Sequence, residues 1–428
     1  MEQTNPPIAD HGTGLTCVPT AKPRYSGRRG PILNAQELSI EVVSAISSVD
    51  EGEWNALLGE GDDVSPFVEW RFLSAFEQAR TLGHSAGWIP QIPLVRRAGR
   101  LVAAAPLYVK FHSHGEFVFD FAWADFANRH GLRYYPKLLT AVPFTPVTGR
   151  RLLTHPAEDH RALLEVLGKI LVELCAHLEL SSAHVNFALD DEIDALVAIG
   201  FIERYDVQYH WRRGPQERSF DDYLQRFTSK KRNQIKRERR TVAEQGLEIL
   251  TLSGDALAEP ALFELAYRIY RSTVDKFAWG RRYLNHDLFK IWFDRMRDQI
   301  LFVVARPVDR KDEVVAGAIN FAKGRRLYGR YWGALVEARF LHFNVCYYHG
   351  IEQCFARGLD VFEPGAQGEH KRVRGFAPTL VKSAHYIRDA SFREVLSHHL
   401  AAERRMMVDR IDAQEDGEDH FGADASSM

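Results

Sequence analysis

The stretch Arg100-Leu-Val-Ala-Ala-Ala-Pro-Leu-Tyr-Val-Lys110 has a counterpart in Glu313-Val-Val-Ala-Gly-Ala-Ile-Asn-Phe-Ala-Lys323, 213 residues further along the chain. Apolar residues occupy almost the same positions in both stretches, and the same offset carries Tyr134-Tyr135 onto Tyr347-Tyr348. Such a match without a gap indicates two copies of one domain, because solenoid units run only roughly 20–50 residues. The alternative is that two unrelated strand–turn–strand units share a composition.

Each copy carries the pattern of an α+β domain with a mixed sheet. In the second copy we expect helices at 264–274, 288–296 and 342–357, the last ended by Gly358, and strands at 301–305, 314–321, 326–332 and 360–363. In the first copy we expect helices at 67–81, 134–139 and 161–178, and strands at 92–95, 101–110, 117–121 and 184–187. The predicted fold class is therefore α+β, built by tandem duplication.

Composition excludes several classes of protein. The 428 residues suggest two or three domains of ~150 residues. A net charge of −2 excludes a chain that binds nucleic acid over its whole surface. No stretch approaches the ~18 apolar residues of a membrane helix, and the N-terminus lacks a secretory signal. The four cysteines form no Cys-x-x-Cys pair, so we expect a cytoplasmic protein without disulfides or zinc ribbons.

Helix breakers crowd the start of the chain, and acidic residues crowd its end. We therefore predict a disordered extension at 1–38 and an acidic disordered tail at 406–428. Between them we predict a first domain at 39–218 and a second domain at 219–405 that opens with a basic helix.

The loop Glu363-Pro-Gly-Ala-Gln-Gly-Glu-His-Lys-Arg-Val-Arg374 is the candidate catalytic segment. Acyl transfer to an amine needs a base for the amine proton, together with positive charge or N–H donors for the oxyanion. His370 or Glu369 is the predicted base, and Lys371 is the predicted oxyanion partner. Glu363, Gln367 and Arg374 of the same loop are assigned to substrate binding. The alternative is a polar surface turn.

A cationic segment, Lys230-Lys-Arg-Asn-Gln-Ile-Lys-Arg-Glu-Arg-Arg240, holds seven basic residues and one acidic residue in eleven. On a chain of this net charge it predicts a local polyanion site on a helix, suited to a tRNA backbone, a CoA pyrophosphate or a lipid head group. The alternative is a solvated helix that joins the domains. The predicted contacts are Lys230, Lys231, Arg232, Lys236, Arg237 and Arg240.

A third candidate is the loop Val142-Pro-Phe-Thr-Pro-Val-Thr-Gly149, which prolines hold extended. Thr145 and Thr148 can hydrogen-bond an acceptor substrate there, and Asp125 and Lys137 lie near enough in sequence to line the same cleft.

Several strings resemble the Fem-like group of peptidoglycan biosynthesis/recognition proteins and N-acyltransferases. The strings are Phe119-Asp-Phe-Ala-Trp-Ala-Asp125, Gly131-Leu-Arg-Tyr-Tyr-Pro-Lys-Leu-Leu139, Val142-Pro-Phe-Thr-Pro-Val-Thr-Gly149, Arg330-Tyr-Trp-Gly333 and Phe362-Glu-Pro-Gly-Ala-Gln-Gly-Glu-His-Lys371. Over roughly residues 40–405, the resemblance implies two domains of the GCN5-related N-acetyltransferase (GNAT) fold. FemA, FemB and FemX, as the more remote relatives, move an amino acid from aminoacyl-tRNA to a cell-wall peptide amine.

The resemblance also bears on single residues. In Fem proteins a lysine that follows a Gly-Leu pair contacts substrate; here Gly375-Phe376 takes that place, and Lys382 follows two residues later than in the family pattern. Lys382 and Arg330 are accordingly further candidates for substrate binding. After Gly333 the chain lacks the Gln/Arg-x-x-Gly-x-Gly/Ala loop by which GNAT domains hold a CoA pyrophosphate. The acyl donor is therefore expected to be aminoacyl-tRNA, with acyl-CoA as the alternative, and no other cofactor is expected.

His342, Cys346 and His349 share one helix face, but no fourth ligand is indicated, so we predict a buried helix face and no metal. The predicted function is transfer of an acyl group, aminoacyl in the first instance, to a primary amine of a small molecule or muropeptide. One alternative is an acyl-CoA-dependent transferase acting on a metabolite or lipid amine. The other is a non-catalytic module that recognises peptidoglycan or nucleic acid.

Overall fold

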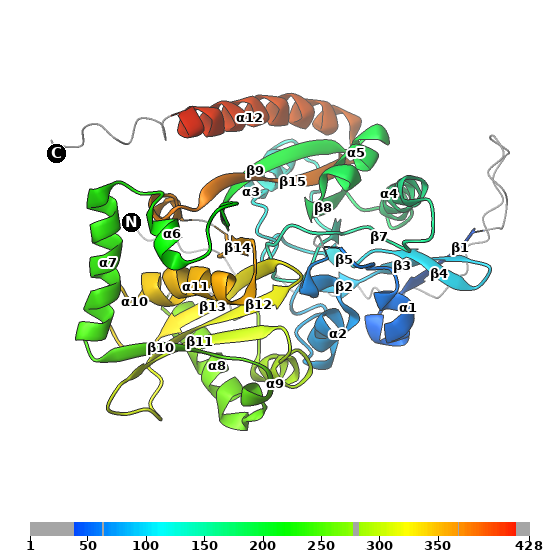
Figure 1. Ribbon diagram of the computed structural model, residues 1–428. Helices are drawn as coiled ribbons and strands as arrows, with labels where there is room; N and C mark the ends of the chain where they lie inside the picture. The colour runs from blue at the N-terminus through cyan, green and yellow to red at the C-terminus, as the bar shows by residue number, and fades with distance from the viewer. Residues whose placement is uncertain (1–37, 62–63, 277–281, 367, 417–428) are drawn as a thin grey trace, which may run out of the picture.

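The computed structural model describes residues 38–416 except 62–63, 277–281 and 367 (Figure 1). The predicted disordered extension thus lies outside the described residues up to residue 37, as does the tail from 417 onward. The elements of the first half are β1 (Leu38–Val43), η1 (Ile46–Ser48), α1 (Glu51–Asn55), η2 (Pro66–Val68), α2 (Trp70–Gln78), β2 (Trp88–Pro90), β3 (Ile92–Arg97), β4 (Arg100–Ala104), β5 (Leu107–Lys110), α3 (Phe121–Arg129), β6 (Lys137–Thr140), β7 (Leu153–Thr154), α4 (His160–His177), β8 (Ser182–Ala188), α5 (Asp190–Ala198) and β9 (Ile202–Arg212).

The second half repeats the order of helices, antiparallel strands, helix and strand. Its elements are α6 (Phe220–Leu224), α7 (Ser229–Glu244), β10 (Leu247–Leu252), η3 (Gly254–Ala258), α8 (Pro260–Val274), α9 (His286–Arg295), β11 (Ile300–Pro307), β12 (Ala316–Lys323), β13 (Arg326–Ala334), α10 (Leu341–Phe343), the π-helical turn η4 (Asn344–Tyr348), α11 (His349–Arg357), β14 (Val361–Glu363), η5 (Glu369–Arg374), β15 (Ala377–Ile387) and α12 (Ala390–Asp416).

Most strands belong to one mixed sheet that runs through both halves. Its order is β10-β11-β12-β13-β14-β9-β15-β8-β6-β5-β2, and a second sheet has the order β1-β3-β4-β7. Each half contributes one parallel pair to the large sheet, β6 with β8 and β13 with β14. A helical crossover joins the two strands of each pair, as parallel pairing requires, through α4 in the first half and α10–α11 in the second.

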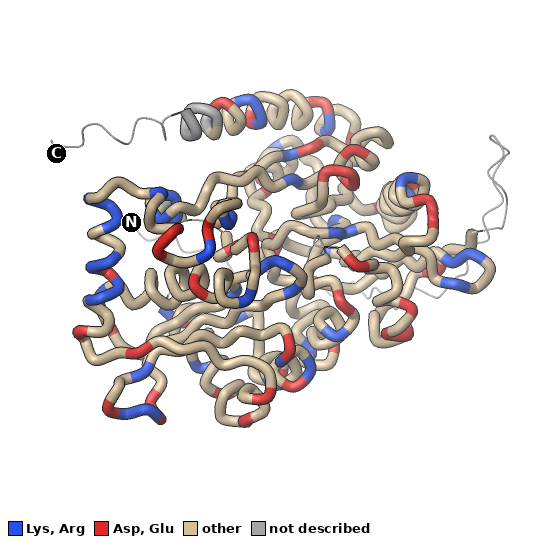
Figure 2. Tube along the Cα trace, in the orientation of Figure 1, with Lys and Arg blue, Asp and Glu red and all other residues tan. Residues whose placement is uncertain are grey.

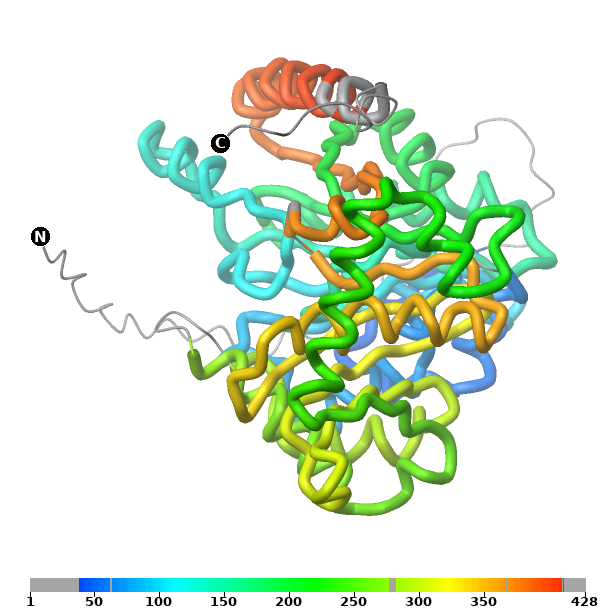
Figure 3. Tube along the Cα trace, turned by 60° about the vertical axis from the view of Figure 1, so that its left-hand side comes forward, coloured from blue at the N-terminus to red at the C-terminus, as the bar shows by residue number. Residues whose placement is uncertain are grey.

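The last strand of each half pairs with the other half. β9 lies beside β14, whereas β15 lies beside β8, and β9 and β15 pair with each other over nine residues, from Ala377↔His210 to His385↔Ile202. α12 covers this central pair (Figures 1 and 3), with Leu396 and Leu400 packed against Ile387 and the first-half residue Trp123. The exchange of strands makes a single sheet of the two copies.

The largest hydrophobic core also joins the halves. Phe67 and Phe72 of the first half contact Phe321, Tyr328 and Trp292 of the second, with ring centroids 5.1–5.8 Å apart. All five side chains are at most 1% exposed. Burial of that much aromatic surface is worth several kcal/mol, so the halves are held together by packing as well as by strand pairing.

Two identical tripeptides, Ser182-Ala-His184 on β8 and Ser383-Ala-His385 on β15, meet where the exchanged strand joins the first half. His184 Nδ1 and His385 Nδ1 are 2.7 Å apart, so one ring donates a hydrogen bond to the other. Each Nε2 contacts the serine of its own tripeptide, at 2.7 and 2.8 Å. Burial lowers the pKa of both imidazoles well below 6.5, so both are neutral in the folded chain.

The predicted β-meander, the helices near 161–178, 264–274 and 288–296, and the C-cap at Gly358 (φ 70°) are confirmed. The repeat is visible in detail. Pro106 separates β4 from β5, and its counterpart Ile319 adjoins the position where the register between β12 and β13 shifts. Both copies therefore interrupt regular pairing at the same place.

Three expectations are wrong. Residues 117–121 form no strand but lead into α3, since the chain there turns over a buried polar cluster. The helix expected at 134–139 is the short buried strand β6, so Tyr134-Tyr135 does not occupy the helical environment of Tyr347-Tyr348. The tail predicted from 406 is helical as far as Asp416, because α12 packs on the central strands and continues beyond them.

The histidine pair predicts a specific loss of stability in acid. An unfolded histidine takes up a proton near pH 6.5, but the two folded rings do not because their pKa is lowered. Above pH 6.5 the two rings therefore do not reduce the free energy of unfolding, and below it that free energy falls. We expect a loss of about 2 to 3 kcal/mol at pH 5.5 from the two rings together. Urea unfolding of wild type and of the double variant His184→Gln/His385→Gln at pH 7.5 and 5.5 measures it. An equal acid loss in the variant would contradict the assignment.

Candidate functional site

The site lies where β13 and β14 stop pairing. The two strands share three residue pairs, from Arg326↔Val361 to Tyr328↔Glu363, after which β13 continues to Ala334 while β14 ends. Just beyond the last pair, Asn320 of β12 faces Gly329 and Ile319 faces Tyr331, so Arg330 is the extra residue of a β-bulge. Bulges of this kind turn a side chain out of the regular alternation, and they are frequent next to active sites.

On one face of the sheet, five polar residues form what we call the seam cluster: Arg151, His210, Arg326, Arg330 and Glu363. Arg326 Nη1 donates to Glu363 Oε1 at 2.9 Å, and His210 Nε2 lies 3.8 Å from Glu363 Oε2. Arg330 Nη2 donates to the carbonyl of Phe144 at 2.7 Å, which ties the loop 142–149 to the bulge. The first half thus supplies one wall of a site that opens in the second half.

The seam cluster holds a carboxyl group with unusual properties. Glu363 is 2% exposed, and burial raises its pKa to about 7, against the opposing effect of the Arg326 charge. Burial and the charges of Arg212, Arg326 and Lys371 lower the pKa of His210 to about 3. At neutral pH the imidazole is therefore uncharged, and the carboxyl group can exchange its proton.

The other face carries the loop cluster, which consists of Cys346, Tyr347, His370, Lys371 and Arg374. Its loop begins at Pro364-Gly365, where the backbone crosses close over Gly329: a Cβ on Gly329 would lie 3.1 Å from Pro364 Cα. Gly365 itself has φ 96°, which favours glycine. The Lys371 amine donates to the carbonyl of Gly365, and it lies 3.4 Å from that of Ala366.

Lys371 is only 2% exposed, and burial lowers its pKa to about 8. His370 contacts Tyr347, with 2.8 Å between the phenol oxygen and Nε2, and partial burial of the ring, with the charges of Lys371 and Arg374, lowers its pKa. Trp332 and His342 complete the surroundings, since their rings are 5.0 Å apart and His342 is 6.0 Å from His370. An amine that titrates near neutrality and a neutral imidazole thus lie side by side.

Arg374 does not point into open space, as a substrate contact would. Its guanidinium lies within 3.0 Å of the Tyr348 hydroxyl and 3.3 Å of Glu238 Oε2, and it stacks over Phe343. Its main role in the structure is to hold the loop to α7. Of the remaining loop candidates, Gln367 lies outside the described residues; Glu369 is the first residue of η5, and its side chain is likewise outside the description.

The predicted polyanion site is a helix, α7, along the edge of the molecule (Figure 2). Lys230, Lys236, Arg237 and Arg240 are exposed, whereas Lys231 and Arg232 are half-buried, and Arg232 donates to the carbonyl of Phe227 at 3.2 Å. A cavity of about 650 Å³ adjoins the helix, lined by Lys236, Arg239 and Arg240 together with Phe220 and Tyr348. Glu352 and Glu248, which also line it, pair with Arg239 and Arg306.

The other predicted substrate contacts are dispersed. Thr145 donates to the carbonyl of Pro143 at 2.9 Å, and the Thr148 hydroxyl is buried without a hydrogen-bond partner within the described chain; both belong to the loop on the seam cluster. Asp125 is exposed on α3. Lys382, on β15, pairs with Asp190 at 2.8 Å. The structure therefore brings Thr145 and Thr148 to the site and leaves Asp125 and Lys382 outside it.

Lys137 belongs to a buried charge cluster that the sequence analysis missed. It donates to Glu116, Asp120 and Ser113, and all four residues are at most 4% exposed. Burial raises the pKa of Glu116 to about 7, against the opposing effect of the Lys137 charge. The sequence analysis did not identify the partners of Lys137 because it predicts a strand over 117–121, the segment that contains Asp120. The repeated Ser-Ala-His tripeptide, which lies beside this cluster, is a signal that could have pointed to it.

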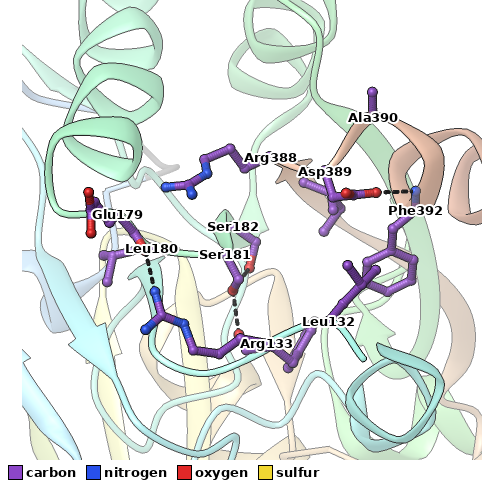
Figure 4. Close-up of a pocket in the computed structure, with 12 residues that line it drawn as sticks. Leu132, Arg133, Glu179, Leu180, Ser181, Ser182, Arg388, Asp389, Ala390 and Phe392 are labelled. Carbon is purple, nitrogen blue, oxygen red and sulfur yellow. Dashed lines mark hydrogen bonds between the residues drawn. The ribbon is translucent and has the colours of Figure 1, made fainter. Parts of the chain in front are cut away.

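A second cavity, of about 410 Å³, opens beside these residues (Figure 4). Its wall includes Ser182 of the first tripeptide, together with Arg133, Glu179, Arg388 and Asp389. Arg133 donates to the carbonyl of Glu179, and Asp389 accepts from the amide of Phe392 at the start of α12. Of the predicted catalytic residues whose side chains the structure describes, His370 and Lys371, neither lines these two cavities.

His349 contacts Thr251 Oγ1 at 2.8 Å, whereas His342 packs against Trp332 and His370, so the two histidines have different surroundings. Across the described residues, no group of three metal-ligating side chains comes together. The same residues include no helix with both the length and the hydropathy of a membrane span.

Comparison with solved structures places the fold. The chain is similar to FemX (11% identity, TM-score 0.50, covering 82% of this chain and 98% of FemX). It is also similar to a tandem GNAT protein from the clavulanic acid biosynthesis pathway (13% identity, TM-score 0.43, covering 82% of this chain and 98% of that protein). A third similar structure is L-PGS from Bacillus licheniformis (9% identity, TM-score 0.46, covering 80% of this chain and 98% of L-PGS). At these identities the likeness to FemX shows the fold alone, and it confirms the tandem GNAT-type α+β architecture. No curated protein sequence matches the chain.

A family model does match, over residues 45–419, which is most of the chain and includes both halves, the seam cluster and the loop cluster. The chain therefore belongs to the FemAB-like family, whose description is peptidoglycan biosynthesis/recognition.

Proposed function

We propose that this protein transfers an acyl group, aminoacyl in the first instance, to a primary amine, and that the reaction takes place where β13 and β14 diverge. The observation that supports it most directly is that the loop at this divergence carries, in adjacent positions, an imidazole bonded to Tyr347, His370, and a buried amine bonded to the carbonyl of Gly365, Lys371. Membership of a peptidoglycan-related family supports a muropeptide or peptidoglycan-precursor amine as the acceptor.

His370 is the proposed base. When its Nε2 carries the hydrogen and donates to Tyr347, the Nδ1 lone pair is available to take the proton that the amine loses as its nitrogen attacks the acyl carbonyl. The proton then passes to the leaving oxygen or sulfur of the acyl carrier. Because burial and two neighbouring cations lower its pKa, His370 is ready to accept a proton at neutral pH.

Lys371 is the proposed partner of the oxyanion. As an ammonium group without a described carboxylate partner, it can stabilise negative charge that develops on the carbonyl oxygen. Its contacts with the carbonyls of Gly365 and Ala366 fix its position before substrate arrives. On the opposite face, Arg330 and Glu363 are proposed to hold the acceptor, with Thr145 and Thr148 on the loop above them. Glu369 remains the alternative base, and Gln367 remains a proposed substrate contact.

The donor is proposed to be carried by aminoacyl-tRNA, bound through the exposed cations of α7. The 650 Å³ cavity between these cations and the aromatic residues Phe220 and Tyr348 supports a carrier that combines phosphates with bases. Acyl-CoA is the alternative donor, since its phosphates would satisfy the same cations.

Removal of the two loop side chains should abolish turnover. We expect His370→Ala and Lys371→Ala each to lower kcat/KM by roughly 10²- to 10⁴-fold, the usual contribution of a proton acceptor or an oxyanion partner. The assay is mass-spectrometric detection of acyl transfer to a muropeptide amine, with mixed aminoacyl-tRNAs and acetyl-CoA as separate donors. Thermal unfolding serves as the folding control. Folded variants with unchanged rates would contradict the mechanism and favour a recognition module.

The pH profile should be bell-shaped. Activity should rise as His370 loses its proton, below pH 6.5, and should fall as Lys371 loses its proton near pH 8. Lys371→Arg, which keeps the charge to far higher pH, should retain activity on the alkaline side if it remains folded. An alkaline limb that rises instead would show that Lys371 works as a neutral amine.

Charge reversal on α7 should weaken the binding of the acyl donor and leave kcat almost unchanged. We expect Lys236→Glu/Arg237→Glu/Arg240→Glu to raise the KM for aminoacyl-tRNA by roughly 10-fold or more at low salt, with little change in kcat, because phosphate contacts are electrostatic. The control reverses three exposed cations elsewhere, Lys169, Lys290 and Arg405, and so has the same net charge. Equal effects in the two triple variants would contradict a local polyanion site.

A further inference from the structure

The one acidic residue of the cationic stretch 230–240 faces inward. Glu238 is 1% exposed, whereas its basic neighbours on α7 are exposed or half-buried. Its carboxylate accepts hydrogen bonds from the Tyr348 hydroxyl, from Gln234 Nε2 at 2.9 Å and from Arg374 Nη2 at 3.3–3.4 Å. Its carbonyl accepts from Asn344 Nδ2 at 3.1 Å.

Arg374, at the other end of this ion pair, is bound in the same way on the loop. It is 4% exposed, its Nε lies 3.0 Å from the Tyr348 hydroxyl, and its Nη1 donates to the carbonyl of His370 at 2.9 Å. Its own carbonyl accepts from the Tyr223 hydroxyl at 2.8 Å, and its guanidinium stacks 3.4 Å from the ring centre of Phe343. Arg374 therefore ties α7 and the η4 turn to the loop that carries His370 through its side chain, and it ties α6 to that loop through its backbone carbonyl.

The two groups cannot move independently. A buried carboxylate or guanidinium that loses its partner costs several kcal/mol, so a displacement of α7 must carry Arg374 with it or break the pair. Tyr348 bonds both groups and also lines the cavity beside the cations of α7. A ligand in that cavity thus touches a side chain that is two hydrogen bonds away from the His370 backbone.

We infer that Glu238 is a positioning residue: through Arg374 it couples the cationic helix and its cavity to His370. The inference rests on the proposed function, because it makes binding of the donor beside α7 a condition for the correct position of His370, the proposed base. In this role Glu238 does not itself contact the substrate.

Among the side chains that the structure describes, four titratable groups lie around His370: Lys371 and Arg374 on its own loop, and Tyr347 and His342 on the helix opposite. The Arg374 cation lowers the pKa of His370. When Glu238 loses its charge, Arg374 keeps its bonds to Tyr348 and to the His370 carbonyl but has no counter-ion, so the pKa of His370 should fall further. When Arg374 loses its charge, that pKa should rise.

The test is an NMR titration of the His370 imidazole in the full-length protein. We expect opposite shifts of roughly half a unit, downward in Glu238→Gln and upward in Arg374→Gln. Glu244→Gln is the matched control, since Glu244 lies on the same helix but is exposed and pairs with Arg240; it should leave the titration unchanged. A purely structural role would loosen the loop in both test variants and move both values toward 6.5.

Shifts in the same direction, or no shift in Glu238→Gln, would overturn the coupling. If a single variant does not fold, the double variant Glu238→Gln/Arg374→Gln removes both charges and leaves neither unpaired; in it the pKa of His370 should rise, and a fall or no change would overturn the inference. Titration with a single-stranded RNA probe tests the proposed function separately. Failure of the RNA to bind would contradict the polyanion site. It would not affect the expectation that the pKa of His370 shifts in opposite directions in the two variants.

Discussion

The pairing of β9 with β15 is the constraint on which the rest of the structure depends. Each strand is the last of its own copy, yet each is hydrogen-bonded into the sheet of the other. Neither half can therefore complete its sheet alone, and the position of β14 relative to the loop 142–149 is fixed by backbone hydrogen bonds rather than by surface contacts. A site built from both halves needs such a rigid connection, because loosely docked domains would not keep Arg330 on the carbonyl of Phe144.

Burial of charge at this junction determines its chemistry. Burial lowers the pKa of Lys371, so its proton is held weakly; burial raises the pKa of Glu363 in spite of the Arg326 charge, so its proton is held more strongly than usual. Both shifts bring groups that are ordinarily charged at neutral pH close to the range in which they can exchange protons. Burial, together with the neighbouring cations, lowers the pKa of His210 and of His370 and so keeps both imidazoles neutral. A site for amine acylation needs this combination of weakly held protons and unprotonated bases.

The sequence predicted what is local. Periodicity identified α4, α8, α9 and the strands β11–β13, and glycine spacing identified the loop at 365–368. It failed at 134–139 because a four-residue buried strand has no periodicity that distinguishes it from a helix turn. It also could not show that Arg374 serves Glu238, since 136 residues separate the two partners. The adjacent residues His370 and Lys371 could be proposed together from the sequence because one loop carries both. The Ser-Ala-His repeat was missed because its offset differs from that of the duplicated strands.

The duplication also explains why the proposed chemistry belongs to one half only. The first half has its own parallel pair, β6 with β8, and the strands diverge after Thr140 as β13 and β14 do. There, however, the loop 142–149 and its neighbour Arg151 fill the equivalent place: Gly149 donates to the carbonyl of Phe187 at 3.1 Å, and Arg151 Nε donates to that of Asn186 at 2.9 Å. The place in the first half that corresponds to the opening of the second half is thus filled by its own chain. The same loop forms a wall of the opening in the second half through the bond from Arg330 to the carbonyl of Phe144, so the two halves contribute different parts to one candidate site.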